Sequence, residues 1–161
     1  SYPTPEMYAN GVVTATLNTE RQNPNAKNIQ PFKVVADTFM KEHNLYEAIL
    51  VDTANNITEG SRSNIFFIKG NEVITALPGD VLLGISRKYV IQACRNIGLT
   101  VTERKISKSE VKLFNAAFVS GTSPKVLPIC KIDDAQYSPT NETLKNIMTE
   151  FDNIISKYIN S

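Results

Sequence analysis

The chain has 161 residues, of which 42% are hydrophobic and 20% charged, values that are ordinary for one globular domain with its own core. The 17 basic and 16 acidic residues are mixed along the sequence and leave a formal net charge of +1, so no basic stripe favours a nucleic acid. No stretch approaches the roughly 20 apolar residues of a membrane helix, so we expect no membrane partner.

The two cysteines do not indicate a metal or redox site. Cys94 and Cys130 are 130 − 94 = 36 positions apart, neither belongs to a CxxC pair, and the chain has a single histidine. We therefore expect no metal. We interpret both residues as reduced, buried thiols of a cytoplasmic protein.

The first third of the chain predicts a strand, a loop and a helix. Residues 11–17 are rich in β-branched side chains, as in a strand, and the polar segment 18–27 is typical of an exposed loop. Pro31 suits the first turn of a helix. The apolar residues that follow recur at three- and four-residue steps, which predicts an amphipathic helix: Phe32, Val35, Ala36, Phe39 and Met40.

The middle of the chain predicts strands followed by a second helix. Residues 48–52, 64–68 and 72–75 are short, mostly apolar runs separated by turn residues, which indicates a meander of strands. Helical spacing then extends over residues 86–97, and Gly98 is placed to end that helix in a left-handed conformation.

The last third continues the alternation of strands and helices. We predict a strand over 99–105, a short helix over 107–114, and strands over 116–120 and 126–130 around a small-residue turn. Ser138 with Pro139 is expected to open a final helix. Its apolar stripe belongs to a core or a subunit contact: Leu144, Ile147, Met148, Phe151, Ile155 and Tyr158. The pattern as a whole predicts one mixed α/β domain.

Few segments carry recognisable chemistry. The sequence lacks GxGxxG, GxxxxGK[ST], HExxH and GxSxG, and His43, which lies among charged residues, is expected to be solvated. Polar residues gather instead in segments 58–64, 82–87 and 120–124. A helix opening at Gly84-Ile85-Ser86 would offer free N–H groups to a phosphate or a carboxylate, although each segment taken alone is also compatible with a simple turn or cap.

Five segments together resemble the class IV, or fold type IV, pyridoxal-phosphate aminotransferases. This group includes branched-chain aminotransferases, D-amino-acid aminotransferase and aminodeoxychorismate lyase. The segments follow the family order and near family spacing between about residues 25 and 129: Ala26-Lys27, Tyr46-Glu47-Ala48-Ile49-Leu50, Glu59 with Asn64-Ile65-Phe66, Leu82-Leu83-Gly84-Ile85-Ser86-Arg87, and Ser120-Gly121-Thr122 before Pro128.

The resemblance implies a fold and a domain organisation. We expect a curved mixed sheet or open pseudo-barrel flanked by helices, which is the large cofactor-binding domain of the D-amino-acid aminotransferase-like fold. Family members are about twice as long as this chain. Residues 1–161 are therefore expected to form a single domain, the carboxy-terminal half of a longer enzyme, without the amino-terminal domain that supplies an arginine for the phosphate and much of the substrate pocket.

The resemblance also implies roles for two charged residues. Lys27 precedes Glu59 by 59 − 27 = 32 positions, near the family spacing, and corresponds to the lysine that forms the Schiff base and moves the substrate proton. Lys33 is the alternative. Glu59 corresponds to the carboxylate that pairs with the pyridine nitrogen of the coenzyme and keeps it protonated.

Further residues match the family's coenzyme and substrate contacts. Leu82 corresponds to the apolar residue on the ring face, the amides of Ile85 and Ser86 with the Ser86 hydroxyl to the phosphate cup, and Thr122 to its closing residue. Threonine is more usual than serine at position 86. The amides of Thr122 and Ser123 are also expected to receive the substrate carboxylate.

The implied function is transamination of an amino acid to its keto acid by a pyridoxal 5'-phosphate enzyme, with a branched-chain or related substrate and a homodimer as the usual assembly. Aminodeoxychorismate lyase shares every residue named above and stays an alternative. A third possibility is a non-catalytic domain that keeps the scaffold.

Overall fold

The computed structural model describes residues 2–19 and 30–160. The strands in these ranges, in chain order, are β1 Val12–Asn18, β2 Glu47–Val51, β3 Asn56–Gly60, β4 Asn64–Lys69, β5 Glu72–Thr75, β6 Thr100–Glu103, β7 Ile106–Ser107, β8 Ala116–Gly121, β9 Lys125–Ile132 and β10 Ala135–Gln136. The helices are α1 Pro5–Asn10, α2 Gln30–His43, α3 Ile85–Asn96 and α4 Glu142–Asn160, with 3-10 turns η1 Pro78–Asp80 and η2 Lys108–Leu113.

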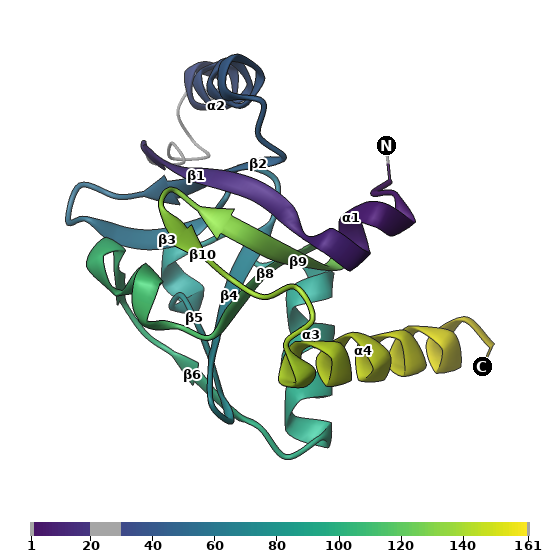
Figure 1. Ribbon diagram of the computed structural model, residues 1–161. Coiled ribbons are helices and arrows are strands. Elements are labelled where there is room, and N and C mark those ends of the chain that lie inside the picture. The colour runs from purple at the N-terminus through teal and green to yellow at the C-terminus, as the bar shows by residue number, and fades with distance from the viewer. Residues whose placement is uncertain (1, 20–29, 161) are drawn as a thin grey trace.

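One mixed sheet organises the domain. The strand order is β6-β5-β4-β8-β9-β1-β2-β3-β7, with β10 paired to β9. β1 runs parallel to both β2 and β9, and β5 runs parallel to β6, whereas the other pairs are antiparallel. The sheet curls into a half-barrel, with α2 beyond β1 and β2 and with α3 and α4 together at another side (Figure 1). The predicted curved sheet flanked by helices is confirmed.

The central strands are apolar on both sides because the curled sheet has a packed interior and a helix-covered exterior. In β4, Ile65 and Phe67 enter the interior cluster, whereas Phe66 and Ile68 pack in the cluster that includes α3 and α4 residues. β8 repeats this alternation. An unbroken apolar run in the sequence therefore marks a strand covered on both faces.

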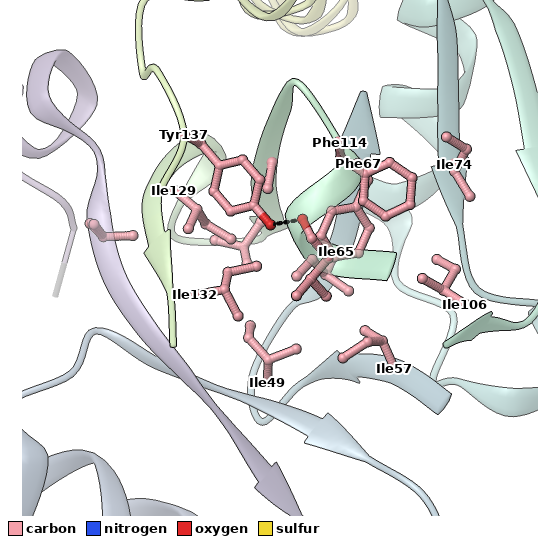
Figure 2. Close-up of a cluster of buried hydrophobic side chains, with 14 of the residues drawn as sticks. Ile49, Ile57, Ile65, Phe67, Ile74, Ile106, Phe114, Ile129, Ile132 and Tyr137 are labelled. Carbon is pink, nitrogen blue, oxygen red and sulfur yellow. Dashed lines mark hydrogen bonds between the residues drawn. The ribbon is translucent and has the colours of Figure 1, made fainter. Parts of the chain in front are cut away.

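The interior of the half-barrel is filled by side chains from most of its strands. Figure 2 shows them pointing toward one another: Ile49, Ile57, Ile65, Phe67, Ile74, Ile106, Phe114, Ile129, Ile132 and Tyr137. The Tyr137 hydroxyl donates a hydrogen bond to the carbonyl of Val111, which satisfies this buried polar group within the cluster. Close packing of this kind leaves little space between the side chains of the interior.

The helices cover the outer face with most of the residues that their periodicity predicts, but Val35 of α2 is 47% exposed, unlike the buried Phe32 and Ala36. Val90, Ala93 and Cys94 of α3 are buried, and so are three α4 residues of the predicted stripe: Leu144, Ile147 and Phe151. Met148 and Ile155 are partly buried, whereas Tyr158 is exposed. Gly98 follows α3 with φ +84°, as its predicted role requires.

Several local predictions were wrong. α1 and β3 were not predicted, whereas the short helix predicted over 107–114 is present as the 3-10 helix η2, which begins with a capping box between Ser107 and Glu110. α4 begins at Glu142 and not at Ser138, because the Asn141 side chain accepts from the Leu144 amide at 3.0 Å and caps the helix there. Of the two thiols, only Cys94 is buried, and Cys130 is partly exposed.

Two kinds of feature are absent from the described residues. Within 2–19 and 30–160, no helix combines the length and the apolar character that a bilayer crossing requires. The same residues contain no group of three acidic, histidine or cysteine side chains placed to hold a metal ion.

Candidate functional site

The segment before α3 is fixed to the rim of the sheet by two polar side chains. Glu59 at the end of β3 is only 3% exposed, and its Oε1 accepts from the Leu82 amide at 3.2 Å. Asn64 at the start of β4 donates from Nδ2 to the Leu82 carbonyl at 3.1 Å. These two bonds hold Leu82 through both its amide and its carbonyl, and they place the start of α3 beside Glu59.

The amino terminus of α3 is open to a ligand. The helix begins at Ile85, its N-cap Gly84 provides no side-chain hydrogen bond, and its first turn carries no acidic residue. Arg87 in this turn is buried, and its charge is matched by Glu103 at 2.9 Å. The first amides and the positive end of the helix dipole are therefore offered to an anion.

The end of β8 and the turn between β8 and β9 contribute hydroxyl groups. Thr122 lies exposed in this turn, and Ser123 follows it half-buried. Ser120, at the end of β8, is fully buried, and its Oγ has no hydrogen-bond partner among the residues that the structure describes. A buried hydroxyl without a partner is costly unless something binds it.

The segment from β3 to β4, the start of α3 and the turn after β8 line one cleft of about 380 Å³. Five residues that the sequence predicted for coenzyme binding line it together: Glu59, Leu82, Ile85, Ser86 and Thr122. Other lining residues include Lys33, Arg62 and Ser120. Leu82 and Ile85 are 64% and 75% exposed, so two large apolar side chains stand uncovered at its edge.

A smaller hollow of about 220 Å³ adjoins the cleft and is lined by Ser123. The two share Arg62, Ser63 and Thr122 as a common wall. Tyr46 contributes from the other side, where burial raises the pKa of its phenol above the usual value against the opposing effect of the nearby Arg62 charge. The cleft and the hollow therefore adjoin at Arg62, Ser63 and Thr122.

A buried carboxylate holds the loop that forms the shared wall. Glu47 is 1% exposed, and its oxygens accept from the amides of Ser61 and Arg62, both at 3.1 Å, and from the hydroxyls of Ser61 and Ser63, the latter at 2.9 Å. Gly60 makes room for it, because a Cβ there would lie 2.8 Å from Glu47 Oε2. Glu47 thus sets the shape of this part of the rim.

The sequence interpretation missed the role of Glu47. Its partners lie 14 to 16 positions away along the chain. One signal was present, since Glu47 is a charged residue at the head of the apolar run that forms β2. A buried acid needs several donors.

Lys27 is the predicted covalent lysine, and Lys33 is the alternative. Lys27 lies outside the described residues, so the structure does not test its assignment. Lys33, the alternative, lies on α2, is exposed and lines the cleft. Lys27 is preferred because its spacing to Glu59 along the sequence is near that of the family.

Other candidates lie away from this rim. His43 is exposed at the end of α2, as predicted, with Nδ1 3.1 Å from the Phe39 carbonyl. A hollow of about 460 Å³ contains none of the predicted site residues, and its Asp133 is bonded to the hydroxyl of Thr16 at 2.7 Å. The larger hollow therefore lies apart from the predicted anion site.

Known proteins show the same half-barrel. The branched-chain amino acid aminotransferase of Escherichia coli superposes with a TM-score of 0.79 at 23% identity, over 89% of this chain and 52% of that one. A putative 4-amino-4-deoxychorismate lyase from Legionella pneumophila gives 0.78 at 19% identity, over 88% and 55%. The fold is that of fold type IV aminotransferases.

Sequence similarity then identifies the family. The profile described as amino-transferase class IV matches residues 1–132. A probable branched-chain-amino-acid aminotransferase of Synechocystis sp. is 29% identical over 121 residues, which are 71% of this chain and 39% of that protein. The chain belongs to the class IV aminotransferase family, and it spans well under two thirds of this relative.

Proposed function

We propose that this chain binds pyridoxal 5'-phosphate in the cleft between Glu59, α3 and the β8–β9 turn, and that the protein containing it transfers an amino group from an amino acid to a keto acid. The observation that carries the proposal is the cleft itself. A buried carboxylate and an uncapped helix amino terminus line the same 380 Å³ space, although they lie 26 positions apart (85 − 59 = 26).

The donors in the cleft fit the phosphate of the coenzyme. The amides at the start of α3 are available, the hydroxyls of Ser86 and Thr122 line the same space, and the buried Ser120 hydroxyl lacks a partner among the described residues. Neutral donors at the positive end of a helix dipole favour binding of the dianionic phosphate. Because these donors carry no charge, no buried charge is left unpaired when the coenzyme dissociates.

The remaining residues fit the pyridine ring. When bound, the coenzyme supplies a protonated ring that takes up the electron pair left on the substrate after loss of the α-proton. Glu59 would keep the ring nitrogen protonated, and its bond to the Leu82 amide holds the carboxylate in place. Leu82 would cover one ring face and exclude water from it. Lys27 would bind the coenzyme aldehyde and then carry the proton at the substrate α-carbon.

The proposed substrates are an amino acid and its keto acid, with branched-chain or related side chains. The support is the name carried by relatives such as the Synechocystis protein. The fold does not separate this activity from aminodeoxychorismate lyase, because both kinds of solved structure superpose almost equally well.

One assay separates the alternatives. The full-length protein is incubated with leucine and 2-oxoglutarate, or with aminodeoxychorismate, in the presence of pyridoxal phosphate. Formation of a keto acid from leucine supports transamination, whereas release of pyruvate from aminodeoxychorismate supports the lyase. A non-catalytic domain would give neither product, and borohydride reduction with the coenzyme would leave Lys27 unmodified.

We further propose that residues 1–161 are the carboxy-terminal cofactor-binding domain of a longer, cytoplasmic and homodimeric enzyme. The first support is that this chain covers only about half of its solved relatives. The second is that Leu82 and Ile85, which would lie beside the coenzyme, are largely exposed.

Without the arginine expected from another domain, the phosphate would lose a charge-assisted contact of typically ~1.5–3 kcal/mol. Titration of the chain alone should therefore show roughly ten- to hundredfold weaker coenzyme binding than the full-length protein.

A further inference from the structure

Arg62 lines both the cleft and the smaller hollow. Its amide donates to Glu47 Oε2 at 3.1 Å, and the hydroxyls of Ser61 and Ser63 on either side of it donate to the same carboxylate. The loop is therefore tied down on both sides of Arg62. Its side chain extends from a fixed point of the rim.

The guanidinium of Arg62 keeps most of its hydrogen-bonding capacity free. The side chain is exposed, its Nη2 donates to the Tyr46 carbonyl at 3.1 Å, and its central carbon lies 6.0 Å from the centroid of the Tyr46 ring. Four of its five N–H groups thus form no hydrogen bond to any residue of 2–19 and 30–160.

The charge of Arg62 also has no acidic partner in the part of the chain that is described. By contrast, Arg87 and Arg104 each hold a carboxylate at 2.9 Å, from Glu103 and Glu110 respectively. Glu47 lies close to Arg62, but its oxygens already accept from the loop amides and hydroxyls. A cation without an acidic partner among the described residues therefore lines the same hollow as Ser123.

A carboxylate matches this arrangement. Guanidinium groups bind carboxylates through two parallel hydrogen bonds, and an adjacent hydroxyl or amide can serve a remaining lone pair. We propose that Arg62 binds a carboxylate of the substrate in the smaller hollow. The proposal rests on the proposed transaminase function and names a residue that selects among its substrates.

The carboxylate has two possible sources, and kinetics distinguish them. In the full-length protein loaded with coenzyme, kcat/KM is measured for glutamate and for leucine with Arg62→Gln. If the side-chain carboxylate binds here, the value for glutamate falls about ten- to a hundredfold and that for leucine is unchanged. If the α-carboxylate binds here, both values fall by this factor. Unchanged values for both substrates overturn the proposal.

Two variants control for other effects of the substitution. Arg62→Lys keeps the positive charge but lacks the planar guanidinium that bonds both carboxylate oxygens, so its kcat/KM should lie between those of the wild type and Arg62→Gln. Arg95→Gln removes an exposed arginine from the last turn of α3, away from both hollows, and should leave both substrates unaffected.

A binding measurement tests Arg62 without turnover. Calorimetric titration of the coenzyme-free full-length protein with glutarate, and with glutaramide as the uncharged match, should show tighter binding of glutarate, and Arg62→Gln should reduce the difference. Equal binding of the two probes by the wild type overturns the proposal. Absence of reaction with any amino acid would contradict the proposed function alone, because an Arg62-dependent preference for glutarate would still stand.

Discussion

The interior of the half-barrel and its rim are built on different physical principles. The interior is filled by aliphatic and aromatic side chains, with the Tyr137 hydroxyl bonded to a backbone carbonyl (Figure 2). The rim is held by directional bonds to two buried carboxylates, Glu47 and Glu59. Packing of the first kind depends on volume and tolerates similar side chains, whereas a carboxylate that gathers several donors has no apolar substitute.

The largest effect is expected from a cavity in the interior. Phe67 is fully buried and stacks on Phe114 with ring centroids 4.6 Å apart. Phe67→Ala should lower the free energy of unfolding by about 3–5 kcal/mol, measured by urea denaturation. Leu113→Ala, at an exposed position, should change it by less than about 0.5 kcal/mol. Similar losses in both variants would contradict the assignment of the interior core.

The rim should respond to loss of its central acid. Glu47→Ala leaves the amides of Ser61 and Arg62 without their acceptor, and hydrogen bonds to a charged group are typically worth ~1.5–3 kcal/mol, so we expect a loss of about 2–3 kcal/mol. In Glu47→Ala, the amides of Ser61 and Arg62 should exchange with solvent faster than they do in the wild type, as measured by hydrogen exchange. The matched control is Glu42→Ala, an exposed acid on α2, which should alter neither measurement.

The fit of the rim depends on a glycine. A Cβ at position 60 would lie 2.3 Å from Ser63 Oγ and 2.8 Å from Glu47 Oε2, so Gly60→Ala must displace both groups. Overpacking of this kind costs typically ~1–3 kcal/mol. Gly79→Ala is the control, since nothing lies within 4 Å of the Cβ position there. Equal stability of the two variants would show that the loop has room to move.

A smaller, pH-dependent effect is expected on the outer face. Burial raises the pKa of Cys94 to about 12 from a usual 9.0. The folded thiol thus keeps its proton above pH 9 while the unfolded one loses it, so unfolding is favoured as pH rises from about 9 to 12. Relative to Cys94→Ala, the wild type should lose about 1 kcal/mol between pH 9 and pH 10 in urea denaturation. A constant difference would contradict the burial of this thiol.

Local patterns were sufficient for most of the architecture. Residues 72–75 were predicted as a strand and form β5, and the helical spacing over 86–97 matches α3 within one residue. The helix has clear periodicity, and the strand is a short, mostly apolar run with turn residues before it. α1 escaped notice because none of its six residues is buried, although Thr4 before Pro5 is an N-cap signal. β3 was missed because its buried positions include the polar Glu59.

The candidate site also contains residues that the sequence predicted and residues that it did not. The family resemblance named Glu59, Leu82, Ile85, Ser86 and Thr122, and the structure brings them to one cleft. Neither Glu47 nor Arg62 received a role. Their contacts join β2 to the β3–β4 loop across 14 to 16 positions, and a single sequence carries no periodic signal for such pairs.

The most direct test of the proposed coenzyme site is to find the lysine that holds pyridoxal phosphate. The full-length protein is reduced with borohydride in the presence of the coenzyme, and the modified peptide is identified by mass spectrometry. We predict a single label on Lys27, retained in Lys33→Ala and lost in Lys27→Ala together with the visible absorbance and most of the turnover. A label on Lys33, or no labelled lysine at all, would contradict the account.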